Sequence, residues 1–345
     1  MIQKQQMALQ MVAPKESAIV KRMVPAGLFL LIAVTYFWLA LKLPSVLISP
    51  KGMDLYFGAD CPRVFANLAF RNSIHYRTSV HPLFSLTNWP VFQGLWMLGG
   101  RSYSFAMAAY SSLVAGASAV VFYAVARHIS GQRSILAVGV TLLAFVSAGW
   151  IYWMPIPETF PVGAFTIVLA TWMLTRKQRG IYTAVVMMLL TLSQTITNVM
   201  FGVIGVFVTA RNRIILLAGG VTFLVAATLA VVQLLAFPTS VPFFLPQVLA
   251  QERTYLTLNP GQWFPRIYDF FAHSYMVSDV LFLTPELIGV TDRANNELTT
   301  LLVMVATAVW IALLLIGFRV ILKSWAENTI GRYLIFALAG QLALH

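Results

Sequence analysis

The chain has 345 residues, of which 59% are hydrophobic and 10% are charged, and its mean hydropathy is +0.80. So few charges cannot cover a soluble protein of this size, which excludes the soluble globular class and makes the lipid bilayer the expected solvent. The single cysteine, Cys61, excludes an intrachain disulfide and has no partner at a metal-binding spacing.

The hydrophobic residues form about nine runs of the kind expected for transmembrane helices. The first run follows Lys21 and Arg22 and is not followed by a small-residue cleavage site, which predicts a retained signal-anchor helix. We therefore expect an all-α polytopic membrane protein with about nine transmembrane helices. The runs are 23–46, 102–126, 134–154, 159–175, 181–194, 196–210, 214–237, 298–322 and 331 onward.

The stretch 181–210 has two readings, one long helix or two short ones. One helix would be about 45 Å long, half as long again as the hydrocarbon core, whereas two helices would each be about 21 Å long. Basic sequences flank the stretch, RKQR at 176–179 and RNR at 211–213. Cytoplasmic loops collect Lys and Arg, so both flanks belong on one side, which predicts a helical hairpin with its tip at SQTITN.

With the N-terminus inside, the two long outer segments are 47–101 and 238–297. The excess of basic residues then falls on the cytoplasmic side, as the positive-inside rule predicts, so the net charge of +12 requires no nucleic-acid partner. We expect one transmembrane module over 1–237, which includes the first outer loop. A second, variable module over 238–345 is expected to start with the second outer loop and to be incomplete in this sequence.

The first outer loop predicts two interfacial helices. Pro62 and Pro82 each suit a first helical turn, and Pro90 restarts or kinks the second helix. At 100° per residue the first helix separates an apolar face from a polar face, as expected of a helix that lies on a membrane surface. The apolar face consists of Val64, Phe65, Leu68 and Ala69, and the polar face of Arg63, Asn67 and Arg71.

Basic side chains gather before the second of these helices, at His75, Arg77 and His81, with Arg63 earlier in the loop. Unpaired backbone N–H groups and the helix dipole attract anions at a helix N-terminus, so this cluster predicts a phosphate-binding site. The alternative is that these residues contact anionic lipid headgroups or cap the helix.

Two acids on the same side are candidates for catalysis. Asp60 stands immediately before the first interfacial helix, where it is either a helix N-cap or a general base. Glu158 stands in the stiff turn WMPIPETFP. An ionisable group at this depth indicates a functional role, and the alternative is that Glu158 caps the next helix.

Neutral and basic residues elsewhere complete the candidate cavity. Thr197 and Asn198 at the hairpin tip offer hydrogen bonds to a substrate, or else cap two short helices. In the second outer loop, PFFLPQVLAQERTY predicts a further interfacial helix, and Arg253 and His273 are available there. The sequence contains no Walker-type, G-x-S-x-G, HExxH or Asp-x-Asp motif, so it indicates neither a bound nucleotide nor a metal site.

The order of these features resembles the GT-C superfamily of membrane glycosyltransferases, which includes protein O-mannosyltransferases and lipid A aminoarabinose transferases. The resemblance covers the topology of the whole chain and rests on GAD at 58–60 and HYRTSVHPLF at 75–84. Members often have paired acids in the first loop, whereas Cys61 follows Asp60 here. This departure leaves the metal requirement and the identity of the base open.

The resemblance implies a GT-C-like fold and an inverting transfer of a sugar from a polyprenyl-phosphate donor to a hydroxyl of a glycan, lipid or protein. Asp60 would take the acceptor's proton, and Glu158 would orient the acceptor or the sugar. Arg77, with His75 or His81, would neutralise the departing phosphate. Residues 1–237 would form the catalytic module, with its site on the periplasmic side of a bacterial inner membrane and with no cofactor.

Two other classes remain as alternatives. A secondary transporter or lipid-linked-oligosaccharide flippase tends to hold ionisable groups near the bilayer midplane, whereas the predicted helices carry neutral groups there, such as Gln194 and Gln233. An O-antigen polymerase or ligase would share the many helices and the basic outer loop. Substitution of Asp60 and Glu158 would separate a transferase from a carrier.

Overall fold

The computed structural model describes residues 17–43, 48, 60–176, 180–209, 212–253, 312, 315–323, 325 and 328–344. Regular structure in these ranges consists of α-helices and short 3-10 helices, without a strand. Three helices are long and apolar enough to cross a membrane: Lys21–Leu41, Tyr103–Ile129 and Arg213–Ala236. Other apolar helices are shorter, so the described chain is all-helical with three candidate membrane spans.

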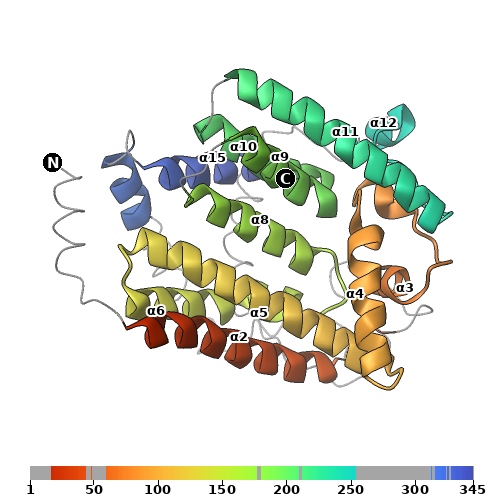
Figure 1. Cartoon of the computed structure of the whole chain (residues 1–345), viewed down its shortest axis with the longest axis horizontal. Coiled ribbons are helices and arrows are strands. Elements are labelled where there is room, and N and C mark those ends of the chain that lie inside the picture. Colours follow the sequence, from red (N-terminus) through yellow and green to blue (C-terminus); the bar gives the residue numbers. More distant parts are fainter. Residues whose placement is uncertain are drawn as a thin grey trace, which may run out of the picture.

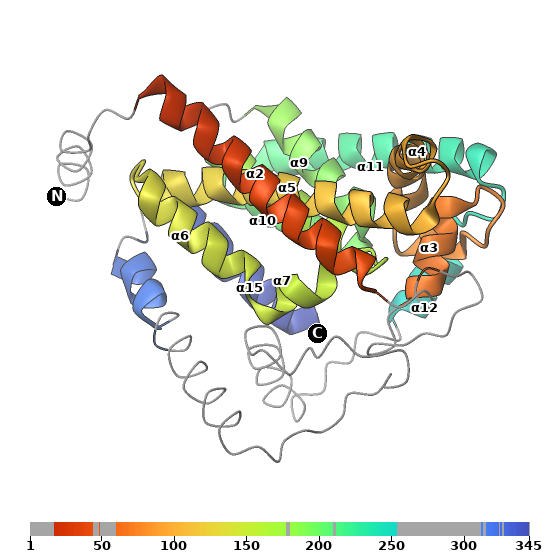
Figure 2. The same ribbon diagram turned by 90° about the horizontal axis from the view of Figure 1, so that it is seen from below.

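The helices form a bundle whose long members run side by side, with smaller helices across one end (Figure 1). In Figure 1, α4 stands upright beside the bundle, and in Figure 2 it is seen along its axis, so it crosses the ends of the long helices. We call this the α4 end. The bundle helices are α2 (Ala18–Leu41), α5 (Tyr103–Ile129), α6 (Ser134–Phe145), α8 (Phe160–Leu174), α9 (Ile181–Gln194), α10 (Val199–Thr209), α11 (Asn212–Ala236) and α15 (Thr329–Leu344). At the α4 end lie α3 (Cys61–Ala69), α4 (Phe84–Leu98) and α12 (Pro246–Arg253).

The hydrophobic run 134–154, predicted as one helix, is divided in two. Helix α6 ends at Phe145, and α7 covers Ala148–Trp153. The hydroxyl of Ser147 donates to the carbonyl of Ala144 (2.6 Å), and Tyr36 of α2 donates to the carbonyl of Phe145 (2.8 Å). These side chains satisfy carbonyl groups that the end of a helix leaves without partners, which allows the break within an apolar sequence.

The predicted hairpin at 181–210 is confirmed. Helices α9 and α10 are separated by the 3-10 helix Ile196–Asn198. A Cβ atom added to Gly202 would lie 2.7 Å from Cα of Met188, and one added to Gly205 would meet the side chain of Met187. Gly205 follows Gly202 in α10 but contacts Met187, which precedes Met188 in α9, so the two helices run antiparallel. Their contact is close because the two glycines carry no side chain.

Gly202→Ala is therefore expected to lower stability, although alanine favours helix more than glycine does. The new methyl group would overlap the backbone of α9, and such overpacking costs about 1–3 kcal/mol. Thermal unfolding in detergent measures the effect. The matched control is Gly220→Ala in α11, where an added Cβ meets nothing within 4 Å. Equal melting temperatures for the two variants would contradict close packing at Gly202.

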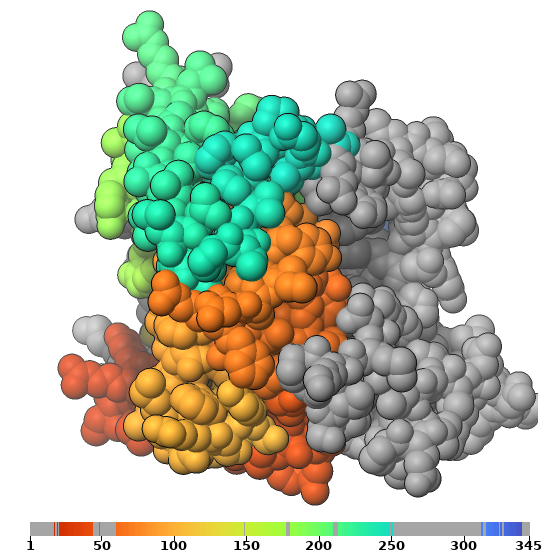
Figure 3. Space-filling view, turned by 90° about the vertical axis from the view of Figure 1, so that its right-hand side faces the viewer, coloured from red at the N-terminus to blue at the C-terminus, as the bar shows by residue number. Residues whose placement is uncertain are grey.

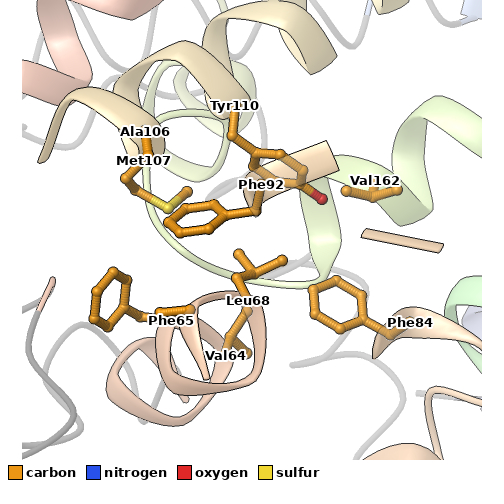
Figure 4. Packing of buried hydrophobic residues seen from close by; sticks show 10 residues of the cluster. Val64, Phe65, Leu68, Phe84, Phe92, Ala106, Met107, Tyr110 and Val162 are labelled. Atoms are coloured by element: carbon orange, nitrogen blue, oxygen red, sulfur yellow. The ribbon is translucent and has the colours of Figure 1, made fainter. Parts of the chain in front are cut away.

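The first helix predicted in the segment 47–101 is present as α3, and its predicted apolar face is buried against other helices of the protein. Val64, Phe65, Leu68 and Ala69 are each at most 7% exposed. Figure 4 shows this face against side chains of α4, α5 and α8, among them Phe92, Met107, Tyr110 and Val162. Helix α4 continues through Pro90, so the proline does not restart the helix. The apolar contact fixes α3 to the bundle and so places the residues at its N-terminus.

Candidate functional site

The two candidate acids meet at the α4 end. Asp60 stands directly before α3, and Glu158 lies in the turn between α7 and α8. The backbone N–H of Asp60 donates to Oε1 of Glu158 (3.3 Å) across 98 positions of sequence. The structure thus places both acids in one site on one end of the bundle.

Asp60 occupies the N-cap position of α3, but its side chain makes no capping hydrogen bond. Its carboxylate instead forms an ion pair with Nη2 of Arg63, one helical turn later. The Asp60 side chain is 33% exposed, so an incoming molecule can reach it. Of the two interpretations drawn from the sequence, a capping hydrogen bond from the Asp60 side chain is absent, and the role of a general base stays a prediction.

Glu158 is 6% exposed, and both of its carboxylate oxygens accept backbone hydrogen bonds. Oε1 accepts from Asp60 and Oε2 from Thr159, the residue before α8. Burial raises the pKa of Glu158, while the Thr159 N–H and the guanidinium groups of Arg63 and Arg77 oppose that rise. Glu158 therefore joins the start of α3 to the start of α8 and fixes the backbone of Asp60.

A small pocket, partly open to solvent, lies next to the acids. We call it the Arg63–Arg77 pocket. Two of the three residues predicted on one polar helix face, Arg63 and Asn67, line it. The third, Arg71, follows the end of α3 at Ala69, lies outside the pocket and donates from Nε to the carbonyl of Ala236 (2.6 Å). The pocket is lined by Arg63, Val64, Asn67, Arg77, Thr78, His81, Phe84, Ser85 and Thr159.

Arg63 connects this pocket to the acids. Nη2 pairs with Asp60, and the guanidinium lies 5.5 Å from the ring centre of Tyr76. Nε and Nη1 are buried and have no hydrogen-bond partner among the described residues. Burial lowers the pKa of Arg63, and the charge of Arg77 acts in the same direction. Two guanidinium groups in one partly buried pocket suit an anionic ligand, since an anion would relieve their mutual repulsion.

His81 also lines the pocket, but not as a cation. Burial lowers its pKa to about 4, and the charges of Arg77 and Arg63 add to the effect. Nδ1 donates to the carbonyl of Gln194 (2.8 Å) at the tip of the hairpin. The ring is therefore neutral near pH 7, which differs from the cationic phosphate ligand that the sequence suggested.

His75 does not line the pocket. Its side chain is fully buried, and burial lowers its pKa. Nδ1 accepts from the hydroxyl of Ser85 (2.8 Å), and Nε2 donates to the carbonyls of Phe70 and Arg71 (3.2 and 3.1 Å). Both ring nitrogens are thus used inside the protein. The predicted contact of His75 with a phosphate would require these bonds to break.

The remaining predicted residues have separate positions. A Cβ added to Gly163 would lie 3.0 Å from Nδ2 of Asn198, so Asn198 contacts the first turn of α8, close to the acids. Thr197 is half-buried in the neighbouring 3-10 helix. Arg253 is the last residue of α12, and its side chain lies outside what the structure describes. His273 also lies outside the described residues.

The chain after α11 lies over the segment that contains α3 and α4. Figure 3 shows the teal surface of the segment after α11 lying against the orange surface of the segment that begins with α3. Thr239 donates to the carbonyl of Ser73 (2.6 Å) and accepts from the backbone of His75 (2.9 Å). The hydroxyl of Thr78 accepts from the backbone of Val241 (2.8 Å). These bonds fix the segment that carries Arg77, although local sequence patterns gave no sign of them.

Several lining residues were not identified from the sequence, among them Thr78, Ser85 and Thr159. Only Thr159 had a local signal, its place beside Glu158. Within the described ranges, no three His, Cys, Asp or Glu side chains are grouped so that they could hold a metal ion. Comparison with protein-family models, curated proteins and solved structures finds no match to this chain.

Proposed function

We propose that the chain is an inverting glycosyltransferase that moves a sugar from a polyprenyl-phosphate donor to a hydroxyl acceptor. The α4 end would face the outer side of the membrane, where such donors present their headgroups. The observation that carries the proposal is the double contact of Arg63, which pairs with the Asp60 carboxylate and lines the pocket with Arg77. A candidate base and a candidate phosphate site therefore share one side chain.

The reaction would use these groups as follows. Asp60 takes the proton of the acceptor hydroxyl as that oxygen forms a bond to the anomeric carbon. The bond between that carbon and the phosphate oxygen breaks, and its electron pair stays on the phosphate. Arg63 and Arg77 stabilise the charge that develops there. Glu158 does not exchange a proton in this scheme, and it holds the backbone of Asp60.

The ion pair between Asp60 and Arg63 would make the base depend on donor binding. A carboxylate held by a guanidinium is a weaker base than a free one. A donor phosphate in the pocket competes with Asp60 for Arg63. Asp60 would therefore be released to act as a base only when a donor is bound. The apolar faces of the bundle would accommodate the polyprenyl tail, since 59% of the chain is hydrophobic.

The test uses purified protein in proteoliposomes with labelled polyprenyl-phosphate sugars and hydroxyl acceptors. We expect a labelled product with inverted anomeric configuration. Arg77→Gln should raise the KM for the donor by about tenfold or more, because a charge-assisted hydrogen bond contributes about 1.5–3 kcal/mol. A melting temperature close to that of the wild type would show that the loss is local. Solute uptake without transfer from any donor would favour a carrier and contradict the proposal.

A further inference from the structure

His81 has a fixed tautomer. Its Nδ1 lies 2.8 Å from the carbonyl oxygen of Gln194, and a carbonyl can only accept a hydrogen bond. Nδ1 therefore carries the hydrogen, and in the neutral ring Nε2 carries a lone pair. The hydroxyl oxygen of Thr195, 3.2 Å from Nδ1, lies on the same side of the ring. Nε2 has no hydrogen-bond partner among the described residues.

The surroundings keep this ring neutral. Burial is the main cause of its lowered pKa, and the charges of Arg77, from the 3-10 helix Tyr76–Ser79, and of Arg63, from α3, lower it further. The hairpin tip that packs against it contributes the neutral Gln194 and Thr195. With a pKa of about 4, His81 stays unprotonated throughout the physiological range. The Arg63–Arg77 pocket therefore combines two positive donors with one neutral acceptor.

A fixed acceptor differs from the other polar groups of the pocket. The hydroxyls of Thr78 and Ser85 can rotate, so each can donate or accept. The Thr78 hydroxyl already donates to the carbonyl of His75 (2.8 Å), and Ser85 bonds the His75 ring. Nε2 of His81 cannot donate while the ring is neutral. An anionic oxygen without a hydrogen placed against it would face a lone pair and lose its solvation.

We propose that the Arg63–Arg77 pocket selects an oxyanion that carries a hydroxyl hydrogen, and that His81 Nε2 accepts this hydrogen while the two arginines bind the anionic oxygens. The inference rests on the proposed function, in which the anion is a phosphate ester. Two sources would supply the hydrogen, a protonated phosphate oxygen or a sugar hydroxyl beside the phosphate. His81 is then the residue that determines which oxyanion fits.

Inorganic phosphate and sulfate are the probes, because they have the same shape but only phosphate carries a hydrogen at neutral pH. Binding is measured by calorimetry on the full chain in detergent at constant ionic strength. We expect the wild type to prefer phosphate about tenfold, since an unmet buried acceptor costs about as much as one or two hydrogen bonds. His81→Asn keeps a donor for the Gln194 carbonyl and removes Nε2, so its preference should fall to about one.

The control is His128→Asn near the C-terminal end of α5, at the opposite end of the bundle, which should leave the preference unchanged. A wild type that binds both anions equally, or a His81→Asn variant that keeps the preference, overturns the inference and leaves the proposed transferase standing. Absence of binding by both anions overturns the anion pocket, and with it the donor site of the proposed function. The two failures are thus distinguishable.

If His81→Asn does not fold, a measurement on the wild type still tests the inference. In 15N-histidine NMR we expect the Nδ1–H tautomer for His81 and a shift of Nε2 with phosphate but not with sulfate. A protonated Nε2 overturns the inference. Methyl phosphate and a hydroxyl-bearing sugar phosphodiester then identify the source. If the preference that depends on His81 is for methyl phosphate, the hydrogen comes from the phosphate. If it is for the sugar phosphodiester, the hydrogen comes from a sugar hydroxyl.

Discussion

Asp60→Asn is expected to lower the rate of sugar transfer about 10²–10⁴-fold, the range that a positioned general base contributes. Asparagine has the shape of aspartate but cannot take a proton. The bond from residue 60 to Glu158 comes from the backbone and is retained. The loss should appear in kcat. The donor KM should stay the same or fall, because Arg63 is released from its ion pair and becomes available to the donor phosphate.

Two further variants sharpen this result, with initial rates in proteoliposomes as the measurement. Glu158→Gln retains one acceptor oxygen but loses the other, so we expect a smaller loss of transfer together with a lower melting temperature. Glu327→Gln is the control, because the positive-inside rule predicts that Glu327, which lies outside the described residues, is on the cytoplasmic side. Full transfer by Asp60→Asn would exclude Asp60 as the base, whatever the other variants show.

The arrangement of helices was largely readable from hydrophobic runs and loop charge. The predicted runs at 181–194 and 196–210 correspond to α9 and α10, and the face of α3 came from its 100° periodicity. These features depend on residues within a few turns of one another, which is the range that periodicity reports. The break between α6 and α7 was missed because Tyr36, far away in sequence, satisfies a carbonyl there.

The site was less predictable, because its parts come from distant segments. The sequence favoured two acids on one side, but it contained no sign of the bond between Asp60 and Glu158. His75 and His81 lie in similar sequence surroundings, yet His75 is buried away from the pocket and His81 lines it. Their difference arises from contacts with Ser85 and the hairpin tip, which only the tertiary fold supplies.

A buried polar network joins α4 to the hairpin tip. Asn88 of α4 donates to the side-chain oxygen of Gln194 (2.9 Å) and accepts from the hydroxyl of Tyr110 (2.7 Å). Gln194 in turn donates to the hydroxyl of Thr87 (3.1 Å). Asn88 and Gln194 are 6% and 3% exposed, so water cannot easily replace a lost partner. The same Gln194 presents its backbone carbonyl to His81, so the network also positions the pocket.

Asn88→Ala and Gln194→Ala are each expected to lower the free energy of unfolding by about 2–3 kcal/mol, because each leaves buried groups without partners. The double variant should cost little more than either single one, giving a coupling of about 1–2 kcal/mol. Chemical unfolding of the four proteins measures this. Thr228→Ala on the exposed face of α11 is the control and should stay within about 0.5 kcal/mol of the wild type. Additive losses would mean that the two side chains stabilise the bundle separately, and the hairpin tip would then not be held by α4 through this bond.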